Sequence, residues 1–246
     1  SGHMFLGRHI GPYAGHSAYE NRWFQGVGLL AVQDVTGPLS NTTIYFNYAY
    51  NMALTKKIRL SAGVAAGFQQ YSLNQDKLRL NDPTASIATG FNELAPDAAL
   101  GIWLYSTSFY MGASMQQVFA KNMFSKETQI LREKHFFFTS GYLLKLSDKF
   151  SLVPSVLIKM VNPAPVSYDL NLKARFEDYL WVGISYRDQD ALAFLLGINI
   201  SDVLDLSYSY DAGTSDLHYY NSGSHEFSIG YLIYPKGKVR SPSDFW

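Results

Sequence analysis

The chain has 246 residues, a length that fits one large all-β domain or two smaller domains. Its 20 basic and 20 acidic residues give a net charge of zero, so no overall field would attract nucleic acid or an anionic surface. The absence of cysteine excludes disulfides, thiolate nucleophiles and thiolate metal sites.

Strand-like alternation of apolar and polar residues recurs along almost the whole chain. In the clearest segment, Leu60, Val64 and Phe68 alternate with small or polar residues such as Ser61 and Gln69. The longest apolar run, "ALAFLLGI" (191–198), is far shorter than the roughly 18 residues that a membrane helix needs. The pattern predicts about twelve strands. They lie at residues 23–32, 42–50, 58–71, 97–105, 108–114, 135–145, 150–160, 168–176, 179–187, 191–199, 203–210 and 224–234.

The connections between these strands alternate in length. "LTKK", "ST", "LSDK", "ED" and "ISD" are tight turns. Up-and-down barrels of outer membranes have short turns on the periplasmic side and long loops outside, whereas a Greek-key sandwich would scatter long connections over both ends. The alternation therefore favours the barrel. The other connections, at 72–96, 115–134, 161–167 and 211–223, are longer, with 33–41 intermediate and 187–190 a short exception.

The strand "YDLNLKARF" (168–176) places Leu170 and Leu172 on one face and Asp169, Lys173 and Arg175 on the other. In a membrane barrel the leucines face lipid and the charges face the lumen. The opposite arrangement would place basic side chains in hydrocarbon, at about 2–4 kcal/mol each at mid-depth. We therefore predict an all-β, antiparallel up-and-down transmembrane β-barrel of about 12 to 14 strands.

Aromatic residues near the predicted strand ends fit the interfacial girdles of such barrels, although aromatics are also good strand formers. Examples are Trp23, Trp103, Tyr179 and Trp181.

A polar network is predicted in the lumen. It can act as a selectivity ring or as a salt-bridge network that fills and stiffens the barrel, and the balance of signs favours the second. Its predicted members are Arg59, Asp169, Lys173, Arg175, Arg187, Asp205 and Glu226.

No pattern indicates catalysis, a cofactor or a metal. None of the six histidines has metal-ligand spacing. Ser224, His225 and Glu226 are adjacent, but neighbouring strand residues point to opposite faces, so Ser224 and His225 would not form a catalytic pair. We expect no catalytic residues, no metal site and no enzyme.

Several segments, in order and over roughly residues 23–246, resemble the PorP/SprF family, outer-membrane barrels of the type IX secretion and gliding machinery. They are "VQDVTGPLSNTTIYFNYAYNMAL" (32–54), "LRLNDP" (78–83), "PSVLIKMVNPAPVSYDLNLKARF" (154–176), "WVGISYRDQDALAFLLGINI" (181–200) and "LSYSYDAGTSDLHYYNSGSHEFSIGYLI" (206–233). The ending "SPSDFW" is also similar. Members of this family have a longer N-terminal region and about fourteen strands, whereas only residues 5–22 precede the first strand predicted here.

The resemblance implies a non-enzymatic barrel in the outer membrane of a Gram-negative bacterium that anchors or helps export a surface protein. Implied partners are an adhesin or other secreted protein with a type IX sorting domain, periplasmic ring or peptidoglycan-binding components, and outer-membrane lipid. A channel for small solutes and a soluble sandwich that binds a partner are the alternatives. We divide the chain into a cloning scar (1–4), the barrel (5–234) and a periplasmic tail (235–246), with any signal peptide already removed.

Overall fold

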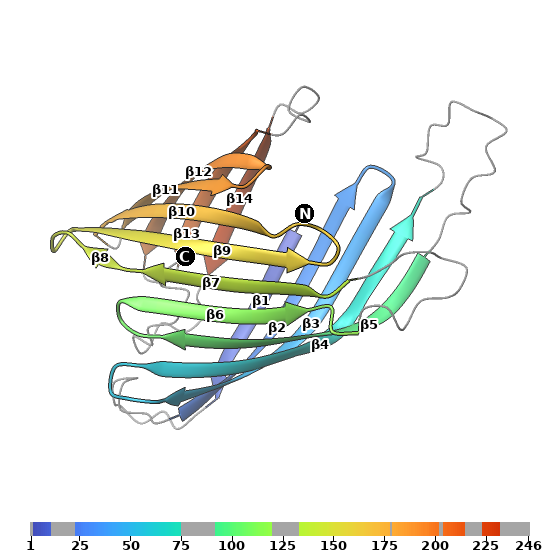
Figure 1. Ribbon diagram of the computed structural model, residues 1–246, viewed down its shortest axis with the longest axis horizontal. Helices are drawn as coiled ribbons and strands as arrows, with labels where there is room; N and C mark the ends of the chain where they lie inside the picture. Colours follow the sequence, from blue (N-terminus) through green and yellow to red (C-terminus); the bar gives the residue numbers. More distant parts are fainter. Residues whose placement is uncertain are drawn as a thin grey trace.

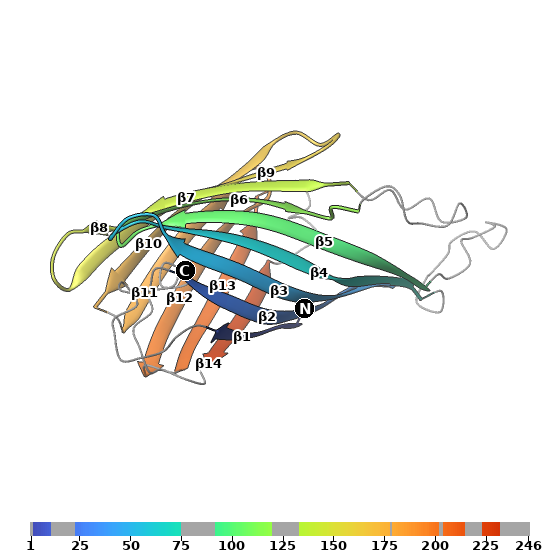
Figure 2. The same cartoon turned by 90° about the horizontal axis from the view of Figure 1, so that it is seen from below.

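A computed structural model describes residues 2–10, 23–74, 92–119, 133–177, 179–201, 204–214 and 223–231. They form a 14-stranded antiparallel sheet in which strands that are consecutive in sequence lie side by side, with only the short β8 off the path. Figures 1 and 2 show this sheet as a single, strongly curved wall. Among the residues described, no helix is long and apolar enough to span a membrane. The strand order is that of the predicted up-and-down barrel, although β1 and β14 are not paired with each other, and the described strands show none of the Greek-key crossings of a sandwich.

All twelve predicted strands are present. One element was missed: β1, which pairs with β2 along its whole length. The predicted strand at 135–145 contains both β7 and the two-residue β8. The strands are β1 (Gly2–Ile10), β2 (Trp23–Thr36), β3 (Leu39–Ala53), β4 (Arg59–Leu73), β5 (Asn92–Tyr105), β6 (Phe109–Gln116), β7 (His135–Tyr142), β8 (Leu144–Lys145), β9 (Phe150–Val161), β10 (Ser167–Phe176), β11 (Leu180–Arg187), β12 (Ala191–Ser201), β13 (Leu204–Gly213) and β14 (Ser224–Tyr231).

The domain boundaries proposed from the sequence stay predictions. Strand β1 includes Gly2, His3 and Met4, which we assigned to the cloning scar. The predicted tail at 235–246 lies outside the described residues.

The predicted intermediate loop at 33–41 is wrong. Strands β2 and β3 continue through this segment and meet at a two-residue turn, Gly37 and Pro38, in which Gly37 has a φ of +60°. Glycine adopts this left-handed conformation without the steric cost that a side chain adds. The sequence suggested a loop because the segment is mostly polar and contains the turn residues Gly37 and Pro38.

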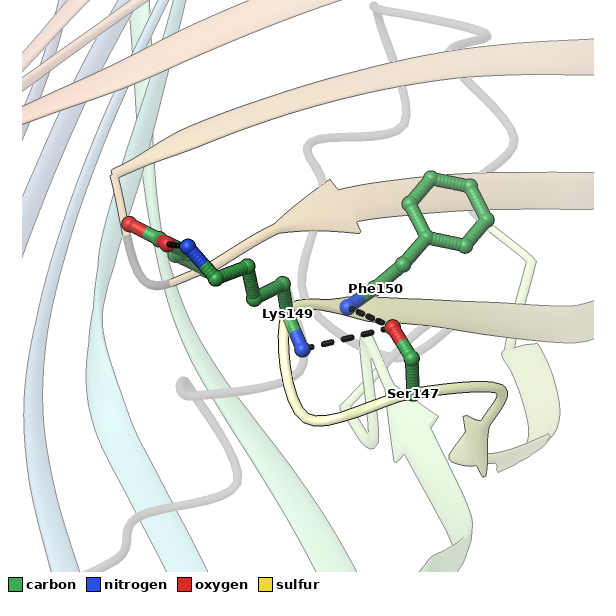
Figure 3. Close-up of polar contacts among 4 residues, drawn as sticks. Ser147, Lys149 and Phe150 are labelled. Atoms are coloured by element: carbon green, nitrogen blue, oxygen red, sulfur yellow. Dashed lines mark hydrogen bonds and ion pairs between the residues drawn. The ribbon is translucent and has the colours of Figure 1, made fainter.

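Three of the tight turns share one device, a Ser or Thr hydroxyl that accepts hydrogen bonds from the backbone. Thr55 Oγ1 accepts from the N–H groups of Lys57 and Ile58, at 3.2 and 3.0 Å. Ser147 Oγ accepts from Lys149 and Phe150 in the same way, at 3.3 and 3.1 Å (Figure 3). These bonds satisfy backbone donors within the turn, which explains how connections of so few residues reverse the chain.

The two faces of the sheet show the burial pattern of an inside-out protein. Large apolar side chains point outward and are exposed, such as Phe46 and Ile102, both 58% exposed. Polar and charged side chains point inward and are buried, such as Asp97 and Asp169, which are 1% and 7% exposed. This arrangement suits a wall with hydrocarbon outside and a polar interior. We refer to the two sides as the outer face and the inner face.

Candidate functional site on the inner wall of the barrel

The predicted lumen residues all lie on the inner face. The strand register places Asp169 opposite Arg187, and Arg175 opposite Trp181, between β10 and β11. We divide the wall into an N-terminal wall (β2–β6) and a C-terminal wall (β9–β13). Most of the predicted charged residues lie on the C-terminal wall.

Asp169 forms an ion pair with a residue that the sequence analysis missed. Lys159 Nζ of β9 lies 2.7 Å from Asp169 Oδ1, and the Asp169 side chain is only 10% exposed. An ion pair at this depth keeps a carboxylate from being buried without a partner. Lys159 was overlooked because its face of β9 also carries Val153, Leu157 and Val161, so the alternation around it is weak.

Arg187 pairs with another residue that was missed. Its Nη1 donates to Asp211 Oδ2 of β13 at 2.7 Å, which spans the intervening strand β12. The small inner-face residue Ala191 of β12 is opposite Arg187 in the register and leaves room for this bridge. Asp211 was assigned to the loop 211–223, but β13 extends to Gly213.

Lys173 lies beside an aromatic ring and near other charges. Its Nζ is 3.9 Å from the centroid of the Trp181 ring of β11, which is within the range of a cation–π interaction. The charges of Arg175 and Asp205 both act on the Lys173 ammonium group. The structure therefore brings three of the predicted residues into one electrostatic group on the C-terminal wall.

Arg59 and Glu226 lie outside this group. Arg59 is 8% exposed on β4, in the N-terminal wall, with β5, β6, β7 and β9 between it and β10 in the sheet. Glu226 lies on β14 opposite Ser209 and is exposed. The seven predicted residues thus share a face but do not form one continuous cluster along the sheet.

The N-terminal wall contains a polar link of a different kind. The Tyr45 hydroxyl of β3 donates a hydrogen bond to Asp97 Oδ2 of β5, across β4. Gly67 of β4 lies between them in the register, and a Cβ there would overlap the Ile44 carbonyl group. Asp97 Oδ1 also accepts from the Ala98 N–H at 2.8 Å. The glycine leaves the space in which the tyrosine reaches the carboxylate.

Large aromatic side chains cover other inner-face glycines. A Cβ on Gly112 would overlap the Trp103 ring, and a Cβ on Gly197 would overlap the Trp181 ring. Trp103 also stacks on Tyr110, with ring centroids 5.1 Å apart. The prediction that Trp103 and Trp181 belong to an interfacial girdle is therefore wrong, because both rings lie on the inner face. Packing over a residue without a side chain fills the wall and fixes the register.

The chemistry of this inner face is that of a filled, cross-linked wall. Of its charged groups, Asp169 and Arg187 form ion pairs, and Lys173 faces an aromatic ring. Within the described ranges, no group of three or more His, Asp or Glu side chains could hold a metal ion. Ser224 and His225 occupy opposite faces of β14, and His225 Nδ1 instead lies 2.7 Å from the Tyr208 hydroxyl oxygen.

The N-terminal wall also extends beyond the thickness of a membrane. Strands β2–β5 have 14, 15, 15 and 14 residues, whereas about 9–11 residues cross a bilayer. Their outer face changes from Ile44 and Phe68 to Thr42 and Gln70 within one register step. We call the polar part beyond this boundary the loop-side projection. It comprises residues 33–36, 39–43, 69–73 and 92–95.

Comparison with known proteins agrees with this geometry. A family model described as "Type IX secretion system membrane protein PorP/SprF" matches residues 12–231. No curated protein matches the chain. Among solved structures, the "CymD monoaromatic hydrocarbon channel" is similar, with a TM-score of 0.52 and 11% sequence identity over 95% of this chain and 87% of that one. At this identity the likeness shows the fold alone.

Proposed function

The chain belongs to the PorP/SprF family of type IX secretion system membrane proteins, and from this premise we propose that it is a non-enzymatic scaffold in the outer membrane. It anchors a secreted surface protein, such as an adhesin with a type IX sorting domain, or assists its export. The observation that carries the proposal is the family match over most of the barrel, combined with an inner wall occupied by paired charges and packed aromatics.

The proposed orientation follows from the lengths of the connections. Tight turns lie on the periplasmic side of outer-membrane barrels, so the turns at Thr55 and Ser147 would face the periplasm and its ring or peptidoglycan-binding components. The loop-side projection would face outward. Most of its side chains are polar, and it is braced by hydrogen bonds such as Gln70 Nε2 to Asn92 Oδ1 at 2.8 Å. A rigid polar surface outside the membrane suits contact with a protein that is being exported.

A second candidate is a channel for small solutes. It is favoured by the polar inner face and by the fold shared with a protein named as a hydrocarbon channel. Conductance in a planar bilayer separates the two candidates. A scaffold with a filled lumen gives no steady current, whereas a steady open pore would favour the channel and contradict the scaffold.

The proposal is tested by crosslinking in native outer membranes, followed by affinity purification of the full-length protein and mass spectrometry. We expect to recover a large secreted protein with a type IX sorting domain or periplasmic components of the system. The Leu94→Asp variant tests the projection, because Leu94 is 67% exposed there. We expect this variant to lose the secreted partner and to keep the periplasmic ones.

The matched control is Leu146→Asp. Leu146 is similarly exposed, at 61%, but lies in a turn on the opposite side of the barrel. Recovery of the barrel alone from the wild type, or equal loss of the secreted partner from both variants, would contradict the proposal.

A further inference from the structure

In the hairpin formed by β7, β8 and β9, the chain extends beyond the end of the neighbouring strand β6. The pairing of β6 with β7 ends at Phe109 and Tyr142, but the chain continues through β8, which pairs with β9 alone among the described strands. Figure 1 shows this hairpin reaching past the β5–β6 turn. Beyond Tyr142, the side of β8 that faces the β5–β6 turn is therefore a strand edge.

The backbone groups at this edge can be assigned from the hydrogen bonds on both sides. Leu143 N–H donates to the Ser108 carbonyl oxygen at 2.7 Å, toward β6, and Leu146 N–H donates to the Phe150 carbonyl oxygen at 3.0 Å, toward β9. Successive residues of a strand direct their backbone groups to opposite sides. Lys145 therefore directs its N–H and C=O away from β9, toward the β5–β6 turn.

A cavity of about 510 Å³ lies at this edge. Two hydroxyl side chains of the β5–β6 turn line one part of it, and the β7–β8 segment lines the rest. It therefore combines hydrogen-bonding side chains, a lysine and a free strand edge. We call it the β8 groove; its lining residues are Thr107, Ser108, Tyr142, Leu143, Leu144 and Lys145.

The groove is held in shape by its surroundings. Ser106 Oγ accepts hydrogen bonds from the N–H groups of Ser108 and Phe109, both at 3.1 Å, which fixes the turn on one side. On the other side, Leu143 packs against the buried pair Tyr105 and Tyr110. A site that is ordered before binding loses less entropy when a ligand binds.

The charge of the groove itself favours an acidic ligand. Of the residues that line it, Lys145 is the only charged one. Lys145 lies in the groove itself, where it could meet a carboxylate.

We propose that the β8 groove binds an extended, acidic segment of a partner protein, which adds to β8 as a further strand. The partner's backbone bonds to the N–H and C=O of Lys145, its acidic side chain pairs with the Lys145 ammonium group, and Thr107 and Ser108 contact its side chains. Strand addition of this kind takes affinity from main-chain bonds and specificity from side-chain pockets. The inference rests on the proposed function only for placing this partner in the periplasm.

The test uses the purified full-length barrel in detergent and a fluorescent, end-capped ten-residue peptide that alternates valine with glutamate. We expect saturable binding that weakens with added salt. A peptide with lysine in place of glutamate, and one that is N-methylated at every residue, should not bind. The second peptide separates strand addition from simple charge attraction, because its backbone cannot donate at the methylated positions.

Two substitutions of Lys145 separate the contribution of its charge to binding from that of its backbone N–H. Lys145→Met should weaken binding several-fold, and Lys145→Pro, which also removes the N–H that faces the groove, at least tenfold. Lys56→Met, which removes an equivalent lysine from the β3–β4 turn, should change binding less than twofold. Heat-modifiable migration in gels confirms that each variant remains a folded barrel.

Equal binding to all three variants, or no saturable binding to the wild type, would overturn the inference. So would a result in which Lys145→Met alters only association with vesicles that contain phosphatidylglycerol, because the groove would then be a lipid headgroup site. The peptide assay does not depend on secretion. If the peptide does not bind, only the proposal for the β8 groove is contradicted. If the crosslinking experiment fails, the scaffold proposal is contradicted and the proposal for the groove still stands.

Discussion

The N-terminal and C-terminal walls differ in the lengths of their strands and in the polar interactions on their inner faces. Strands β2–β5 of the N-terminal wall have 14 or 15 residues and carry a polar link, Tyr45 to Asp97, whereas β10–β13 have 8 to 11 residues and carry the ion pair of Arg187 with Asp211. Strands of the second length match the hydrocarbon thickness, so their inner charges lie at membrane depth and need partners. The extra length of the first wall, roughly four residues or 13 Å, places polar groups where water can solvate them.

The largest expected change in unfolding free energy tests where the membrane-spanning part of β5 ends and the loop-side projection begins. Leu100 and Leu94 both lie on the outer face of β5, below and above the change from apolar to polar residues. Leu100→Arg should lower the free energy of unfolding in liposomes by about 2–4 kcal/mol, because arginine would enter hydrocarbon. Leu94→Arg should cost less than about 1 kcal/mol. Denaturant titration measures both losses of unfolding free energy, and equal losses for the two variants would contradict the proposed boundary.

The next effect tests the device that both walls share. Gly112→Ala in the N-terminal wall and Gly197→Ala in the C-terminal wall would each force a methyl group into a tryptophan ring. We expect each to cost about 1–3 kcal/mol of unfolding free energy.

The matched control for these glycines is Gly183→Ala. Its Cβ would lie 3.5 Å from Leu195 Cβ, an ordinary contact, so we expect a change within about 0.5 kcal/mol. Equal effects at Gly183 and Gly197 would indicate that glycine matters for the strand backbone and not for the ring above it.

A smaller effect tests whether the ion pairs of the C-terminal wall stabilise it. Asp169→Ala leaves Lys159 without its partner and should cost about 1–2 kcal/mol. Adding Lys159→Met should recover part of this loss, because the unpaired charge is then removed. The coupling is measured by a double-mutant cycle, and simple additivity of the two substitutions would show that the pair contributes nothing.

The smallest effect is expected at the tight turns. Lys149 and Glu177 form an ion pair whose side chains are 70% and 48% exposed. Glu177→Gln should change the free energy of unfolding by less than about 0.5 kcal/mol, since exposed pairs are screened by solvent and salt. A larger loss would mean that this turn is more rigid than its exposure implies.

The sequence predicted the face of the sheet on which a side chain lies better than it predicted which side chains contact one another. Alternation placed Leu170 and Leu172 outside and Asp169 inside, and the structure agrees, because the side-chain period of a strand is fixed. The partners of Asp169 and Arg187 depend on which residues of neighbouring strands lie opposite one another. That register is set by turn lengths and packing, which no single segment contains.

The projection was missed for a related reason. Alternation identifies a strand only where its two faces meet different surroundings. Residues 33–36 and 39–43 lie beyond the apolar boundary and are mostly polar on both faces, so the signal weakens although the hydrogen-bonded ladder continues. A similar argument explains Lys159, because its face of β9 mixes polar and apolar residues.

The central claim is the inside-out arrangement of the wall, and single-cysteine scanning of β10 tests it most directly. The chain has no native cysteine, so each variant carries one reactive position. Cysteines at 170, 171, 172 and 173 are labelled with a fluorophore, and the barrel is placed in bilayers that contain brominated lipids. The account predicts strong quenching at 170 and 172 and weak quenching at 171 and 173. Equal or reversed quenching would contradict it.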